Sequence, residues 1–193
     1  MANTFSSLAE AGSSWHDWRA INPDWFASPA ARPFADEILA VLRKDFTGSH
    51  LFAIKDPRIC RFWPLWRDVV TEFGAKPVIV MPVRNPLEVA ASLKQRDGFV
   101  PAKSHLLWLR HVLDAESTTR GVMRAITFYE SLIEDWQNVI ATVTPQLGLS
   151  GPRRGATVDI EIRDAKESRR TVSGPNDVGV ELQEPREPLR RPI

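Results

Sequence analysis

The sequence predicts an α/β domain with a small parallel sheet flanked by helices over residues 1–150, followed by a polar tail over residues 151–193. Two observations support this fold class. Before residue 150, apolar runs typical of strands alternate with segments in which apolar residues recur at helical spacing. All seven tryptophans, all nine phenylalanines and the one tyrosine also lie in that part. The hydrophobic core is therefore expected to end near residue 150.

The first half of the domain predicts a helix, a strand and a second helix. Pro33 and the apolar spacing after it predict a helix over 32–46, because proline is favoured in a first turn. The apolar run over 51–55 predicts a strand that ends at Lys55, since Pro57 disfavours a helix immediately before it. Residues 61–73 then predict a helix closed by a glycine.

The central strand is predicted over 76–84, a β-branched run typical of a strand buried on both faces of a parallel sheet. The run over 51–55 is its expected partner. Asn85 is a good N-cap residue and Pro86 suits the first helical position, so a helix is expected to begin there and stop near Gly98.

The second half predicts a helix, a strand and a helix. These elements are expected over 103–119, 125–129 and 132–143. The tail over 151–193 carries nine Lys+Arg, eight Asp+Glu and five prolines but no aromatic residue, so it is expected to be disordered.

Composition excludes several function classes. The net charge of +1 gives no broad positive field, so neither a nucleic-acid nor a membrane partner is expected. One cysteine, Cys60, and four scattered histidines predict no disulfide and no metal site. With no apolar stretch of membrane-spanning length, the expected location is the cytoplasm.

Two positively charged residues are candidate anion ligands, because ligands of parallel sheets bind at the carboxyl ends of the strands. Arg84 and Ser92 are spaced to hold a phosphate beside the first two turns of the helix that begins at Asn85. Lys55 could stabilise charge on a departing phosphate. The structural alternatives are a solvated strand end for Arg84, a packed small residue for Ser92 and a polar turn around Lys55.

Three segments resemble the bacterial sulfotransferase-family proteins that use 3′-phosphoadenosine 5′-phosphosulfate (PAPS). They are IKDPRICRFWPLW, then VRNPLEVAASLKQRDGF, then LLWLRHVLDAE followed by TRGVMRAITFYESLIEDW, and the similarity covers roughly residues 13–149. The resemblance implies a P-loop-like fold and transfer of a sulfuryl group from PAPS to a hydroxyl or amine acceptor. It implies that Arg84 and Ser92 bind the 3′-phosphate, that Lys55 faces the sulfuryl group, and that Tyr129 lies near the adenine.

The chain departs from the family at the 5′-phosphosulfate site. It contains no glycine-rich loop of the kind G-x-x-R-S-G-T-S, whose backbone N–H groups would hold that group. The fold is therefore expected to be incomplete and the activity weak or absent. His16 and Asp17 are candidate bases by chemistry only, and a packing role is favoured for the histidine.

Two other functions stay open on the sequence. One is a non-catalytic remnant or interaction module on the same scaffold, which would self-associate through an exposed sheet edge. The other, a nucleoside kinase or related P-loop NTPase, is disfavoured because the chain has no G-x-x-x-x-G-K-[ST] motif.

Overall fold

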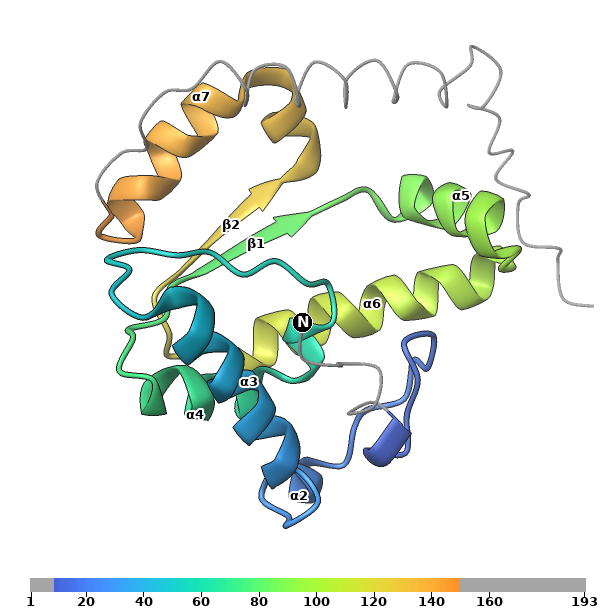
Figure 1. Cartoon of the computed structure of the whole chain (residues 1–193). Coiled ribbons are helices and arrows are strands. Elements are labelled where there is room, and N and C mark those ends of the chain that lie inside the picture. Colours follow the sequence, from blue (N-terminus) through green and yellow to red (C-terminus); the bar gives the residue numbers. More distant parts are fainter. Residues whose placement is uncertain (1–8, 150–193) are drawn as a thin grey trace, which may run out of the picture. The chain divides into compact units, whose positions relative to one another are not determined.

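The computed structural model describes residues 9–149, so the predicted tail over 151–193 lies outside the described residues. Figure 1 shows the order of the elements. In chain order they are α2 (Pro23–Phe26), α3 (Arg32–Phe46), the short 3₁₀ helix η1 (Ile59–Arg61), α4 (Trp63–Glu72), β1 (Ile79–Val83), α5 (Pro86–Asp97), α6 (Pro101–Thr118), β2 (Arg124–Phe128) and α7 (Tyr129–Gln146).

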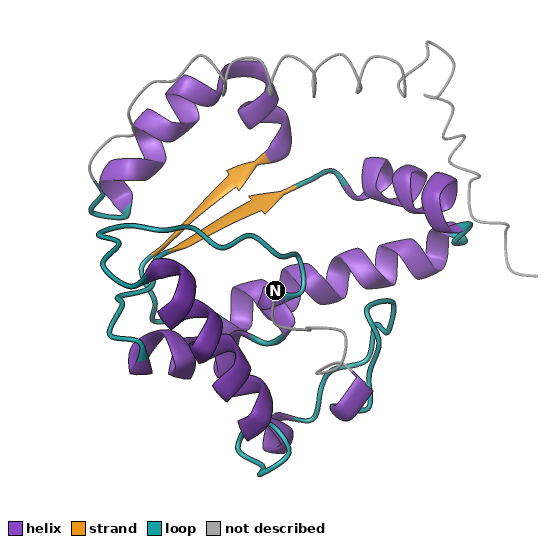
Figure 2. Ribbon diagram, viewed as in Figure 1, coloured by secondary structure: helices purple, strands orange, loops and turns teal. Residues whose placement is uncertain are grey.

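The α/β class and the small parallel sheet are confirmed. Within the described residues, two parallel strands form the sheet and helices flank it (Figure 2). Strands β1 and β2 pair in register from Ile79 opposite Arg124 to Val83 opposite Phe128. The strand predicted over 125–129 is therefore present, displaced by one residue.

The helix boundaries follow the local capping signals. Helix α3 has the bounds expected from the sequence. At the start of α5 the Asn85 side chain accepts a hydrogen bond from the backbone N–H of Leu87, at 2.9 Å. Gly98 ends α5 with φ +68°, a left-handed conformation that glycine adopts without steric cost.

The strand predicted over 51–55 is wrong. That segment is an irregular loop, and the partner of β1 is β2. Aromatic packing holds the loop instead: the Phe52 ring stacks on Phe46 at 4.5 Å between centroids and meets the edge of Phe73 at 5.8 Å. Leu51, at the start of the loop, is 66% exposed. An apolar run alone therefore does not show whether a segment pairs with a strand or forms a loop that one aromatic side chain anchors.

The prediction that the central strand is buried on both faces is also wrong. Paired residues of parallel strands point to the same face. On one face Met81 is 7% exposed but its partner Ile126 is 52% exposed, and on the other Ala125 is 2% exposed but its partner Val80 is 49% exposed. Each strand therefore buries a different face.

Two helices explain this diagonal burial. The Oγ1 atom of Thr119, which ends α6, lies 3.8 Å from the sulfur of Met81 on one face. On the other face Val143 and Leu147, from the carboxyl-terminal part of α7, pack with Ala125. The other face of each strand carries exposed apolar side chains, such as Val80 on β1 and Ile126 on β2.

The larger hydrophobic cluster lies away from the sheet. It joins the segment before α2 to α2, α3 and α4. Its buried members are Ile21, Trp25, Ala31, Ile38, Leu39, Leu42, Phe62, Leu65, Val69 and Val70.

Arg61 fixes the amino-terminal segment against this cluster. Its side chain is fully buried, and its Nη1 and Nη2 atoms donate to the carbonyl oxygens of Asp17 at 2.8 Å and Arg19 at 2.6 Å. Its Nε lies 3.4 Å from the carboxylate of Asp114 on α6. One guanidinium thus connects three segments that are far apart in sequence.

We predict that Arg61→Met lowers the free energy of unfolding by about 3 kcal/mol, because removing the buried charge leaves Asp114 with Arg110 alone and takes the donor from the carbonyl oxygens of Asp17 and Arg19. Arg67→Met is the matched control, since Arg67 lies exposed on α4 beside Asp68. Urea unfolding followed by tryptophan fluorescence measures both. A loss in Arg61→Met no larger than that in Arg67→Met would show that the connection is dispensable.

His111 lies in the same network. Its Nδ1–H donates to the carbonyl oxygen of Leu107 at 2.8 Å. Burial lowers the pKa of His111, and the charges of Arg61 and Arg110 act in the same direction, while the Leu107 hydrogen bond and Asp114 oppose them. The folded protein therefore binds this proton less tightly than the unfolded chain.

We predict that stability falls as the pH drops from about 7.5 to about 5.5, through the ordinary histidine range, because the unfolded state takes up a proton that folded His111 resists. In His111→Gln this pH dependence should be smaller. His50→Gln, in an exposed loop, should behave like the parent protein. Urea unfolding at both pH values is the measurement, and an unchanged slope in His111→Gln would refute the assignment.

Candidate functional site

The carboxyl ends of β1 and β2 bring two predicted site residues together. Val83 pairs with Phe128, so the next residues along each strand, Arg84 and Tyr129, emerge side by side. The guanidinium carbon of Arg84 lies 4.8 Å from the centroid of the Tyr129 ring, within the range of a cation–π interaction. The carbonyl oxygen of Arg84 accepts a hydrogen bond from Trp108 Nε1 at 2.9 Å, which fixes this point of the backbone.

One nitrogen of the Arg84 guanidinium is bound to a carboxylate within the protein. Its Nε donates to a carboxylate oxygen of Glu88 at 3.1 Å, and both side chains are half-buried. Across residues 9–149, this is the hydrogen bond that its guanidinium makes, so Nη1 and Nη2 are available to an anion. Those two nitrogens are the ones that grip a phosphate in a two-point contact.

A second carboxylate at this edge belongs to Glu130, which lies in the first turn of α7, directly after β2. Glu130 accepts a hydrogen bond from the backbone N–H of Asn85 at 3.2 Å, which ties the end of β2 to the start of α5. Neither Glu88 nor Glu130 was among the residues predicted for the site. The sequence signal for both was position: Glu88 is four residues from Arg84, and Glu130 directly follows Tyr129.

Ser92 lies half-buried in the second turn of α5. Glu88 is one helical turn before it, so both side chains share a face of the helix. No hydrogen bond joins Arg84 to Ser92 in the part of the chain that the structure describes. A phosphate that touched both would have to lie against the Glu88 carboxylate.

Lys55 does not end a strand. It lies exposed in the loop that follows α3, so the argument that placed it at the same sheet edge as Arg84 no longer holds. The turn after it is well formed: Asp56 accepts hydrogen bonds from the backbone N–H and the Nε of Arg58, each at 2.8 Å. Burial raises the pKa of Asp56, but these bonds outweigh it and leave the pKa below its ordinary value.

The two candidate bases lie elsewhere. Arg19 holds the Asp17 carboxylate with Nε at 3.0 Å and Nη2 at 2.8 Å, and this hydrogen bonding lowers the pKa of Asp17 to about 2. Such a carboxylate is a poor proton acceptor at neutral pH. The His16 ring packs edge-on against Trp15 at 5.5 Å and Phe99 at 6.1 Å, which fits the packing role.

Cys60 is expected to be unreactive. Burial raises the pKa of the Cys60 thiol to about 12, so it remains protonated and a weak nucleophile. Among the described residues no cluster of histidine, cysteine, aspartate and glutamate side chains could hold a metal ion.

Comparisons with protein-family models, with curated proteins and with solved structures find no match to this chain. Within residues 9–149, no helix is both long and apolar enough to cross a bilayer.

Proposed function

We propose that this protein is a sulfotransferase-family domain that binds a nucleotide sulfate donor, PAPS, through its 3′-phosphate. The observation that carries the proposal is the Arg84–Tyr129 pair at the carboxyl edge of the parallel strands, beside the amino-terminal end of α5. A guanidinium with two available nitrogens suits a phosphate, and an aromatic ring beside it suits a base or a sugar face. Ser92 could add a hydroxyl donor from the second turn of α5.

The residues fit one end of the donor better than the other. Arg84 and Tyr129 fit the 3′-phosphate and its nucleoside. The sequence has no glycine-rich loop for the 5′-phosphosulfate, and Lys55 lies in an exposed loop. We therefore propose nucleotide binding with weak or no sulfuryl transfer, and the class of hydroxyl or amine acceptor stays open.

A second candidate function is a non-catalytic interaction module. The exposed apolar side chains of Val80, Ile126 and Phe128 on the sheet favour it, because exposed apolar surface on a sheet commonly marks a contact site. Self-association through the sheet edge is one form that this function could take. Analytical ultracentrifugation separates the two candidates, since nucleotide binding requires no oligomer.

We predict that adenosine 3′,5′-bisphosphate binds with a dissociation constant near or above about 1 mM, because a two-point arginine contact and one hydroxyl hydrogen bond contribute roughly 2–4 kcal/mol. Arg84→Ala should abolish binding and Arg84→Lys should give an intermediate affinity, since lysine keeps the charge but not the planar fork. Ligand-observed NMR titration is the measurement.

Adenosine 5′-monophosphate, which lacks the 3′-phosphate, is the ligand control for that titration. Arg67→Ala is the protein control, because Arg67 lies exposed on α4. Equal binding of the two nucleotides, or binding that Arg84→Ala leaves unchanged, would contradict the proposal.

We also predict that Glu88→Gln tightens binding of the bisphosphate about two- to fivefold, because it removes a carboxylate that competes with phosphate for Arg84. Glutamine keeps the side-chain oxygen that can serve the start of α5. Glu37→Gln, on α3, is the matched control. The same NMR titration applies, and weaker binding in Glu88→Gln would show that Glu88 positions Arg84 for the ligand.

A further inference from the structure

A hollow lies at the amino-terminal end of the sheet, away from the Arg84 edge. It has a volume of about 870 Å³ and is lined in part by Val78 and Ile79 at the start of β1 and by Met123 just before β2. The loop after α3, helix α4 and the residues that end α7 complete it. Strands of this length separate their two ends by about 16 Å, so a ligand here would not touch Arg84.

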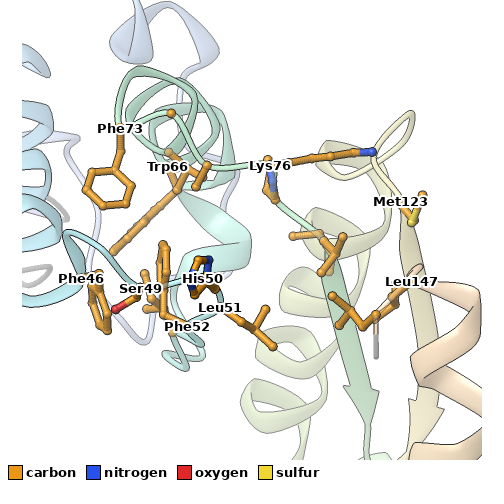
Figure 3. Close-up of a pocket in the computed structure, with 18 of the residues that line it drawn as sticks. Phe46, Ser49, His50, Leu51, Phe52, Trp66, Phe73, Lys76, Met123 and Leu147 are labelled. Carbon is orange, nitrogen blue, oxygen red and sulfur yellow. The ribbon is translucent and has the colours of Figure 1, made fainter. Parts of the chain in front are cut away.

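Aromatic rings form one side of the pocket. Figure 3 shows Phe46, Phe52, Trp66 and Phe73 gathered on one side, with Met123 and Leu147 on the other. The stacking of Phe46 on Phe52 at 4.5 Å orders this wall. Most of the side chains that line the pocket are apolar, and a volume of this size is typical of sites that bind a small organic molecule.

Two buried donors in this lining lack acceptors. The indole N–H groups of Trp63 and Trp66 are buried and have no hydrogen-bond partner in the described chain, and Trp63 is only 4% exposed. An unsatisfied buried donor is costly, so each of these N–H groups is a candidate partner for any ligand oxygen that reaches it.

The charges around the opening favour an anion. The cations Arg43 and Lys76 line the pocket with exposed side chains, and Lys76 extends towards Met123 in Figure 3. Among the described residues that line it, Glu72 is the acidic one, and Arg32 lies 4.0 Å from its carboxylate. The opening therefore carries an excess of positive charge over an apolar interior.

We propose that this pocket binds an apolar monoanion, an acyl or aryl carboxylate. Its hydrocarbon body lies against the aromatic wall and its carboxylate faces the basic opening. The site is separate from the proposed nucleotide site, because the two lie at opposite ends of the strands. Either proposal can fail without the other.

The test is isothermal titration with sodium dodecanoate, with 2-naphthoate as the aryl probe and dodecanol as the uncharged one. We expect the full chain to bind at least one carboxylate, dodecanol to bind at least about threefold more weakly than dodecanoate, and carboxylate affinity to fall as salt rises. Met123→Trp, which fills the pocket from a partly exposed position, should abolish binding. No binding of either carboxylate would overturn the proposal.

Single variants locate the ligand. Lys76→Gln should weaken carboxylate binding about three- to fivefold, whereas Lys44→Gln, an exposed lysine of α3 outside the lining, should not. Arg84→Ala should leave carboxylate binding unchanged, and adenosine 3′,5′-bisphosphate should not compete. Equal binding of dodecanol and dodecanoate, or binding that Met123→Trp and Lys76→Gln leave intact, would overturn the proposal.

Discussion

The structure depends on one buried guanidinium. Arg61 donates to the carbonyl oxygens of Asp17 and Arg19 and pairs with Asp114, so it holds the amino-terminal segment and α6 to η1 at a single point. The charge can be buried because its partners are already placed there, and Asp114 also receives Arg110 at 3.0 Å. The same segment also buries Ile21 in the larger hydrophobic cluster, so the polar connection and the apolar packing act on one stretch of chain.

Features set by local signals could be predicted from the sequence, and features set by long-range contacts could not. Helices α3 and α5 could be predicted almost to the residue, because proline in the first turn, an asparagine cap and a closing glycine act within a few residues of one another. Arg61 could not be predicted, because two of its partners are backbone carbonyls more than 40 residues away, and carbonyls leave no mark in a sequence. The predicted partner of β1 was wrong for a different reason: the run over 51–55 packs its Phe52 ring on Phe46 instead of joining the sheet.

At the candidate site the sequence predicted Arg84 and Tyr129 themselves but not the residues that lie around them. Arg84 and Tyr129 meet because the strands pair residue by residue up to their last positions, which follows once β1 and β2 are known to be partners. Glu88 and Glu130 were not expected beside them, since their roles come from the way α5 starts and β2 ends at one edge. Lys55 shows the converse, because its expected position rested on a strand that the chain does not form.

The two ends of the sheet therefore offer different electrostatics. At the carboxyl edge Arg84 pairs with Glu88, so a ligand must carry enough negative charge to compete with Glu88 for the guanidinium. A phosphate dianion meets this requirement better than a carboxylate. At the amino-terminal end the cations stand around an apolar interior with one acidic neighbour, so a single negative charge suffices and burial of hydrocarbon supplies most of the affinity. The short parallel sheet thus separates the two proposed anion sites, which differ in charge requirement and in hydrophobicity.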